Sequence, residues 1–119
     1  MSGCILVVDD NLDILESMSR LLKSAGYDVV TATDGQVALD RLRGGTTPSL
    51  ILLDLMMPGM NGWQFLEELH RDPSLTAIPV VIVSGGSHPA KEIESLGVAG
   101  YLKKPFDVSK LFAMVEQFR

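Results

Sequence analysis

An abrupt change from apolar to charged residues within residues 50–59 constrains this chain more than any other feature. Leu50–Leu53 are four apolar residues, Asp54 follows them directly, and Pro58-Gly59 comes a few positions later. A short apolar run followed by Pro and Gly predicts a buried strand that opens into a loop. Because a lone carboxylate is costly to bury, the tip of Asp54 must face water, a cation or a partner. Taken alone, Asp54 fits a polar residue that merely ends a strand better than a functional group.

Three further apolar runs are followed by a polar or charged side chain at their carboxyl end. They are Cys4–Val8 before Asp9-Asp10, Ile78–Val83 before Ser84, and Tyr101-Leu102 before Lys103-Lys104. In an open parallel sheet, the carboxyl ends of the strands form the edge at which ligands bind. The repeated pattern therefore predicts a functional site at one edge of a sheet, with Asp54 in it.

Segments with helical spacing separate these apolar runs. Asn11, Asp34 and Asp107 are N-cap residue types, and Phe106 with Leu111 is placed for a hydrophobic staple. Apolar residues at helical spacing support the first helix: Leu15, Met18, Leu22 and Ala25. The expected helices run from Asn11 to Gly26, from Asp34 to Gly44, from about Gly62 to Arg71, from Pro89 to Leu96 and from Asp107 onward, with additional strands at 28–32 and about 100–103.

Strict alternation of strands and helices predicts a doubly wound α/β fold, a parallel sheet with helices on both faces. The first, third and fourth strands are the most apolar and should be central, whereas the second and fifth suit the edges. Right-handed crossovers then favour the strand order 2-1-3-4-5. We find no repeat or interdomain linker, so residues 1–119 are expected to form one domain.

Composition excludes several classes of function. The formal net charge of -5 argues against direct binding of nucleic acid. No stretch approaches the roughly 20 apolar residues that span a bilayer, and no signal segment opens the chain. The single cysteine, Cys4, lies in an apolar run and suits a reducing compartment. We therefore expect a cytoplasmic protein that does not bind membranes.

The predicted strand order places Asp9-Asp10 beside Asp54, with Ser84 and Lys104 on the other side. Packed carboxylates repel one another, and a divalent cation removes that conflict. Oxygen-only ligands suit Mg²⁺, which also binds phosphate oxygens. With the cation bound, Asp54 is able to carry a phosphoryl group or attack one, while Lys104 neutralises charge and the Ser84 hydroxyl donates to a phosphoryl oxygen.

These residues resemble, over essentially the whole chain, the CheY-like receiver domain of two-component response regulators. The matching features are Asp9-Asp10, Asp54 with the following Met57-Pro58-Gly59 and Gly62, Ser84 with Gly85, and Lys104-Pro105-Phe106. The resemblance implies a flavodoxin-like (βα)5 fold and a phosphorelay in which a sensor histidine kinase or a histidine phosphotransfer protein is the donor. A downstream effector would then receive the signal.

The resemblance also implies a role for each residue. Asp54 would be the phosphoacceptor, and Mg²⁺ would be bound by Asp9, Asp10, Asp54 and the backbone carbonyl of Met56. Ser84 would be the switch hydroxyl and Tyr101 the rotating aromatic residue. Lys104, next to the proline, matches the position of the family's lysine, whereas Lys103 is interpreted as a surface charge. The Lys104-Pro105 peptide bond is expected to be cis. Such a domain catalyses only its own phosphorylation and dephosphorylation.

The chain departs from the family pattern in two places. The segment from Ser84 to Tyr101 is about two residues short, so the fourth helix is expected to be short or displaced. Apolar Met56 and side-chain-free Gly86 flank the site without orienting water, so loss of phosphate should be slow. Three alternative functions remain open. They are a receiver-like interaction module that is no longer phosphorylated, a Mg²⁺-dependent phosphohydrolase with an aspartate nucleophile, and a flavin-binding module, for which Asp9-Asp10-Asn11 has the wrong charge.

Overall fold

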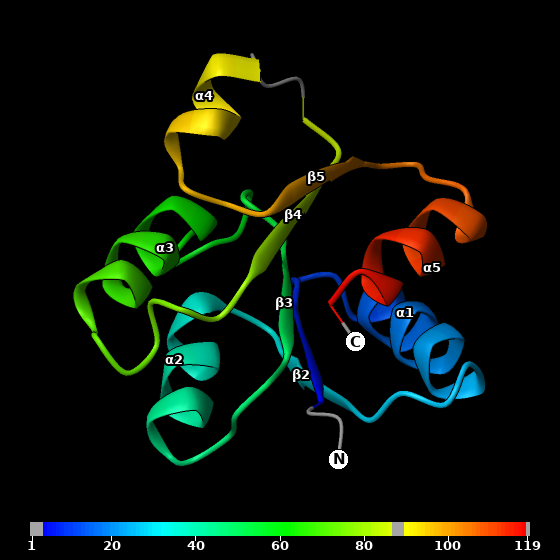
Figure 1. The fold of residues 1–119 in the computed structure, drawn as a ribbon, viewed down its shortest axis with the longest axis horizontal. Coiled ribbons are helices and arrows are strands. Elements are labelled where there is room, and N and C mark those ends of the chain that lie inside the picture. Colours follow the sequence, from blue (N-terminus) through cyan, green and yellow to red (C-terminus); the bar gives the residue numbers. More distant parts are fainter. Residues whose placement is uncertain (1–3, 87–89, 119) are drawn as a thin grey trace.

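A computed structural model describes residues 4–86 and 90–118 of the chain. In that part, five strands alternate with five helices, as the sequence predicts (Figure 1). The elements in chain order are β1 (Ile5–Val8), α1 (Leu12–Ser24), β2 (Val29–Ala32), α2 (Gly35–Arg43), β3 (Leu50–Leu53), α3 (Gly62–Arg71), β4 (Val80–Ser84), α4 (Ala90–Ser95), β5 (Gly100–Lys103) and α5 (Val108–Glu116).

The five strands form one parallel sheet in the order β2-β1-β3-β4-β5, which confirms the predicted topology. Val8 at the end of β1 pairs with Leu53 at the end of β3, and Leu53 pairs with Ile82 of β4. The ends of the central strands are therefore level with one another. This register brings the residues that follow β1 and β3 to the same edge of the sheet.

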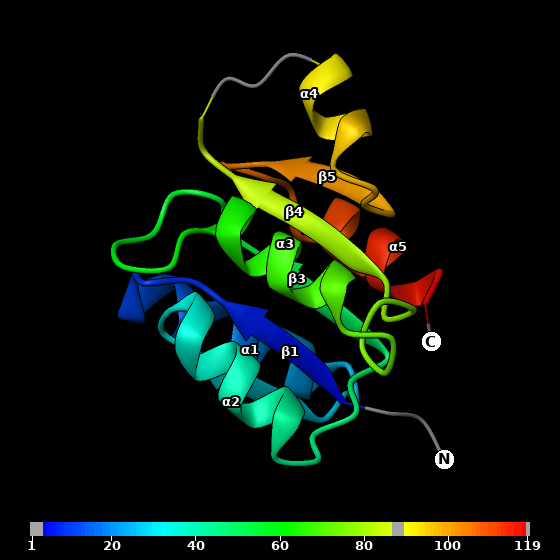
Figure 2. The same ribbon diagram turned by 90° about the vertical axis from the view of Figure 1, so that its left-hand side faces the viewer.

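Helices cover both faces of the sheet. Figures 1 and 2 show α2 and α3 on one face and α1 and α5 on the other, with α4 beyond β5. Successive strand residues contribute to opposite faces: Leu6 and Val8 pack into the α2–α3 core, and Ile5 and Val7 pack into the α1–α5 core. Because both faces are buried, the central strands read as continuous apolar runs rather than as alternating ones.

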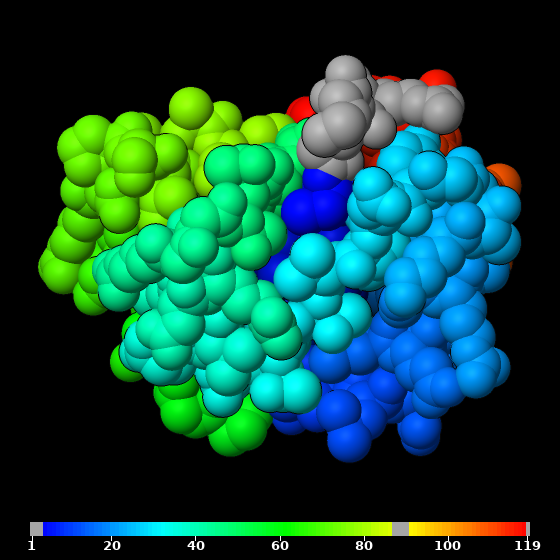
Figure 3. All heavy atoms as spheres, turned by 90° about the horizontal axis from the view of Figure 1, so that it is seen from below, coloured from blue at the N-terminus to red at the C-terminus, as the bar shows by residue number. Residues whose placement is uncertain are grey.

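The β2 edge of the sheet lies between two helices. Figure 3 views the molecule from this side, with α1 in blue and α2 in blue-green on either side of the β2 segment in cyan. The β2 strand is less buried than β1 or β3, in keeping with its more polar sequence. Within the described residues, none of the helices combines the length and apolar character that a membrane crossing requires.

The helix ends confirm some sequence expectations and correct others. Asn11 caps α1 through its side chain, and Asp34 caps α2 in the same way. Ala25, counted above among the apolar residues at helical spacing, is exposed and serves as the C-cap of α1, so the helix ends just before it. Asp107 occupies the N-cap position of α5, but its side chain makes no capping hydrogen bond, which corrects that prediction.

The fourth helix is short, as the sequence led us to expect. It comprises the six residues Ala90–Ser95, and its apolar Ile93 packs into the α2–α3 core. The predicted start at Pro89 lies outside the described residues. The helix ends before Gly97, whose φ of 69° lies in the left-handed region that favours glycine.

Candidate functional site

An acidic cluster lies at the carboxyl edge of the two central strands. Asp9 and Asp10 directly follow β1, and Asp54 directly follows β3. The Asp54 N–H donates to the carbonyl of Val8 at 3.0 Å, which continues the pairing of the two strands by one residue. One carboxylate oxygen from each of Asp9, Asp10 and Asp54 lies within 4.8 Å of the other two. Asp9 and Asp54 are 3% and 7% exposed, whereas Asp10 is open to solvent.

Lys104 supplies the positive charge opposite this cluster. Its Nζ lies 2.6 Å from Asp9 Oδ2 and 3.8 Å from Asp54 Oδ2. The residue directly follows β5, and its backbone N–H donates to the Ser84 carbonyl at 2.9 Å, so the backbone from which the side chain extends is fixed. The Lys104-Pro105 peptide bond is cis, as expected. The neighbouring Lys103 is exposed, which confirms its assignment as a surface residue.

The pKa of Asp54 reflects opposing influences. Burial raises the pKa of this carboxyl above its ordinary value, whereas the Lys104 ammonium and the hydrogen bond from the Met56 N–H act to lower it. The charges of Asp9 and Asp10 raise it further. The Met56 N–H donates to Asp54 Oδ1 at 3.2 Å and thereby fixes the orientation of the carboxylate. A bound cation would relieve both the burial cost and the repulsion.

The acidic cluster fits Mg²⁺ on chemical and geometric grounds. All three side chains offer oxygen, the donor type that Mg²⁺ prefers. Ligand oxygens about 2 Å from an octahedral ion lie roughly 3 to 4 Å apart, so oxygens within 4.8 Å of one another need to move little. Asp10 is exposed and gives the ion a route from solvent. These residues could therefore hold the metal.

Ser84 and Tyr101 are both connected to Gly86. Ser84 ends β4 and is fully buried, and the Gly86 N–H donates to its Oγ at 3.4 Å. The half-buried Tyr101 donates its hydroxyl to the Gly86 carbonyl at 3.2 Å. Sequence reasoning named both side chains but missed Gly86 as their shared partner. Only a backbone contact reveals that connection, because glycine carries no side-chain signal.

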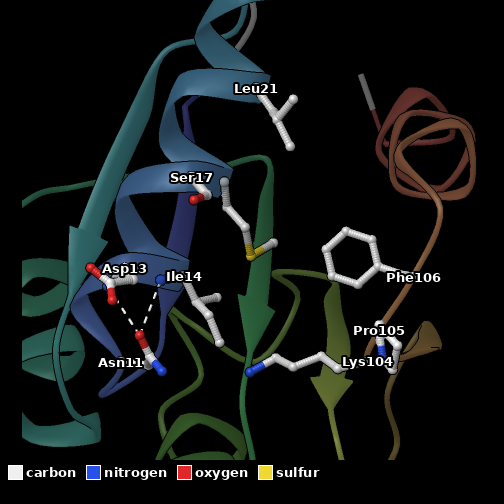
Figure 4. A pocket seen from close by; sticks show the side chains of 9 residues that line it. Asn11, Asp13, Ile14, Ser17, Leu21, Lys104, Pro105 and Phe106 are labelled. Carbon is white, nitrogen blue, oxygen red and sulfur yellow. Dashed lines mark hydrogen bonds between the residues drawn. The ribbon is translucent and has the colours of Figure 1, made fainter.

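An apolar groove adjoins the cluster and was also missed by sequence reasoning. Its volume is about 490 Å³, and it lies between α1 and the segment after β5. Figure 4 shows Ile14 and Leu21 on the α1 side and Lys104, Pro105 and Phe106 on the other. Lys104 therefore lines the groove and also contacts the acidic cluster. The separation of these segments in sequence hid the groove.

Known proteins resemble this chain over nearly its whole length. The model of the response regulator receiver domain matches residues 5–116. Response regulator PleD of Caulobacter vibrioides is 41% identical over 97% of the chain, and the transcriptional regulatory protein FixJ of Bradyrhizobium diazoefficiens is 36% identical over 96%. The chain spans only 26% of PleD and 55% of FixJ, so it corresponds to a part of each.

Solved structures give the same result. A response regulator receiver protein from Pseudomonas putida superposes with a TM-score of 0.91 at 30% identity, covering 98% of both chains. Response regulator TrrA from Thermotoga maritima, solved in complex with Mg(2+)-BeF, gives a TM-score of 0.86 at 28% identity, covering 98% of this chain and 99% of TrrA. The family match, the sequence identities and the fold agree with one another. This chain therefore belongs to the response regulator receiver domain family.

Proposed function

We propose that this chain accepts a phosphoryl group on Asp54 from a phosphohistidine of a partner protein, with Mg²⁺ bound at the acidic cluster. One observation carries the proposal: the carboxylates of Asp9, Asp10 and Asp54 converge within 4.8 Å, and the Lys104 ammonium lies 3.8 Å from Asp54. The Mg(2+)-BeF complex of TrrA supports the choice of metal. The backbone carbonyl of Met56 is the proposed fourth protein ligand.

In the proposed transfer, an oxygen of the Asp54 carboxylate attacks phosphorus. The bond between phosphorus and the imidazole nitrogen breaks, the nitrogen keeps the electron pair, and the product is an acyl phosphate on Asp54. The Met56 N–H holds Asp54 Oδ1 during the attack, and Lys104 neutralises charge on the phosphoryl oxygens. When bound, Mg²⁺ supplies further neutralisation of the same charge.

The switch in this proposal consists of Ser84 and Tyr101. The Ser84 hydroxyl donates to the new phosphoryl oxygen, and it gives up the hydrogen bond that it accepts from Gly86. Because Tyr101 is hydrogen-bonded to the same glycine, movement of Gly86 is transmitted to the aromatic ring. The phosphoryl group shifts the equilibrium by binding one arrangement better than the other.

The proposed donor is a sensor histidine kinase or a histidine phosphotransfer protein in the cytoplasm. In this proposal, residues 1–119 act as one receiver unit. The unit makes no direct contact with nucleic acid, and the phosphoryl group is its only substrate. The output is a change in affinity for a partner protein. Transfer of phosphate from a purified candidate kinase to Asp54 of this chain would identify that kinase as a donor.

The direct test is incubation with MgCl₂ and a radiolabelled small phosphodonor such as acetyl phosphate. We expect stoichiometric label that hydroxylamine removes, as an acyl phosphate requires, and no label after chelation of the metal. The Asp54→Asn variant should take up none, and full labelling of that variant would contradict the assignment. Wild-type protein that takes up no label would instead favour the interaction module, and turnover of phosphate esters would favour the phosphohydrolase.

A further inference from the structure

Met56 is the most exposed methionine in the described part of the chain. Its exposed fraction is 61%, against 7% for the adjacent Met57 and 3% for Met18, while Met60 and Met114 are half-buried. Packing therefore does not account for an apolar side chain at this position. Its thioether sulfur is open to reagents in solution, whereas the sulfur of its neighbour is not.

The backbone around Met56 is held on both sides, so the point from which the side chain extends is fixed. The Met56 N–H donates to Asp54 Oδ1 at 3.2 Å. Further along the same loop, Met57 is buried in the α2–α3 core, and the Met60 carbonyl accepts from the Gly35 N–H at 3.3 Å. Met56 thus lies two residues after the proposed phosphoacceptor, on a loop whose backbone is held at both ends.

We propose that Met56 is a site of reversible oxidation by hydroperoxides and that this oxidation shortens the life of the phosphoryl group on Asp54. The sulfur lone pair attacks the distal peroxide oxygen, the O–O bond breaks, and a sulfur–oxygen bond forms. With hydrogen peroxide, the departing hydroxide combines with the released proton as water. Sulfur is oxidised by two electrons and the peroxide is reduced by two. Methionine sulfoxide reductases reverse the change.

The expected consequence follows from the hydrogen-bonding capacity of the two forms. A thioether accepts hydrogen bonds weakly, whereas a sulfoxide is strongly polar. Oxidation therefore replaces a weak acceptor with a strong acceptor for water, on the residue whose N–H is bonded to the Asp54 carboxylate. One additional hydrogen bond to the attacking water corresponds to about a fivefold faster loss of phosphate. This consequence rests on the proposed function, but the selective oxidation of Met56 does not.

Cys4 is the competing target for peroxide, and its surroundings slow that reaction. Burial raises the pKa of the Cys4 thiol above its ordinary value. Thiols react with peroxides as thiolates, so a raised pKa lowers the reactive fraction. A thiol reductant added after the peroxide step returns any sulfenic acid to the thiol and leaves methionine sulfoxide in place, which separates the two lesions.

The experiment uses the full chain and dilute hydrogen peroxide, followed by a thiol reductant. Peptide mapping by mass spectrometry gives the oxidation rate of each methionine, and label from acetyl phosphate gives the phosphoryl half-life before and after oxidation. Among the methionines that the structure describes, we expect Met56 to form its sulfoxide first. We also expect the half-life to fall about fivefold and reductase treatment to restore it. Each variant is compared with its own unoxidised sample. Met57→Leu, the matched control at the adjacent buried position, should respond as the wild type does, and Met56→Leu should show no response.

Three outcomes would overturn the inference. They are oxidation of Met57 as fast as that of Met56, an unchanged half-life with Met56 fully oxidised, and an equal response in Met56→Leu. A wild-type chain that takes up no label even before oxidation would overturn the proposed function itself, together with the consequence for phosphate. The peptide map distinguishes the two failures, since it is read without any phosphodonor.

Discussion

Asp54 is a carboxylate that folding moves from water to a buried position beside two others. Burial and the charges of Asp9 and Asp10 raise its pKa, and Lys104 and the Met56 N–H offset only part of that increase. A folded-state pKa above the unfolded one means that the folded state binds the proton more tightly. Ionised Asp54 therefore destabilises the metal-free fold above the folded pKa, and this cost disappears as the pH falls through the window between the two pKa values.

This residue gives a prediction about stability. In the absence of metal at neutral pH, Asp54→Asn should raise the free energy of unfolding by on the order of 1 kcal/mol, because the amide carries no charge to desolvate or repel. The gain should shrink as the pH is lowered through the folded pKa of Asp54. Urea titrations in EDTA at several pH values measure it. Asp40→Asn, at an exposed carboxylate, is the control and should change stability by less than about 0.5 kcal/mol. A neutral-pH loss of stability in Asp54→Asn would contradict the argument.

At the scale of elements, the N-termini of α3 and α5 differ in their capping. The Asn61 side chain accepts from the Gln64 N–H at 2.9 Å, and the Gln64 side chain accepts from the Asn61 N–H at 3.0 Å, which completes a capping box. Asp107 stands at the corresponding position of α5 without a side-chain capping bond. Two helices with similar cap residues are therefore held at their N-termini by different interactions.

The difference predicts unequal effects of alanine at the two caps. Asn61→Ala should cost about 1 kcal/mol in the free energy of unfolding, because the Gln64 N–H loses the side-chain oxygen that accepts its hydrogen bond. Asp107→Ala should cost only about 0.3 kcal/mol, the contribution of a charge near the helix dipole. Urea denaturation of both variants measures the two costs. Equal losses in the two variants would contradict the predicted difference between the caps of α3 and α5.

Gly62 begins α3 in close contact with the segment that carries Asp54, the proposed phosphoacceptor. A Cβ at this position would lie 2.6 Å from Leu55 Cα and 2.7 Å from the Asp54 carbonyl oxygen, both of them backbone atoms. The Gly62 N–H also donates to the Leu55 carbonyl at 3.0 Å. The lack of a side chain at Gly62 thus permits the helix to approach the site.

We expect Gly62→Ala to destabilise the fold by about 2 kcal/mol, the usual cost of overpacking, and to weaken Mg²⁺ binding, since the backbone of Asp54 and Leu55 must move. Gly85→Ala is a matched control, because the nearest atom to its added Cβ is Lys104 Cβ at 3.8 Å, an ordinary contact. Thermal unfolding and titration calorimetry measure the two effects. Wild-type metal affinity in Gly62→Ala would show that the site tolerates the displacement.

At the scale of the whole molecule, the proposed metal binding should be coupled to folding through the acidic cluster. Asp9 and Asp10 follow one strand and Asp54 another, so the cluster exists only when the strands are paired. A ligand that binds only the folded state stabilises it, by about 2.7 kcal/mol at a hundred times its Kd. Folding therefore assembles the cluster, and Mg²⁺ in turn should stabilise the fold.

Mg²⁺ should accordingly raise the melting temperature of the wild-type chain, and EDTA should reverse the shift. The shift should decrease as the pH falls, because protonated carboxylates bind the ion poorly. Asp10→Asn removes the exposed one of the proposed ligands without altering the core and should reduce the shift, whereas Asp13→Asn, also exposed but on α1, should retain it. Differential scanning calorimetry with and without MgCl₂ measures each case. A shift of full size in Asp10→Asn would exclude that residue as a ligand.

The sequence by itself determined the strands and their order. It also determined that three carboxylates and Lys104 follow the carboxyl ends of these strands. These features are written in neighbouring residues: an apolar run, then a charge, then turn residues. Only the tertiary structure decided that Asp107 leaves its helix uncapped by a side chain, that Ser84 and Tyr101 share Gly86, and that α1 and Phe106 enclose a groove. Such features depend on how distant segments pack in space, and local residue preferences carry no record of that packing.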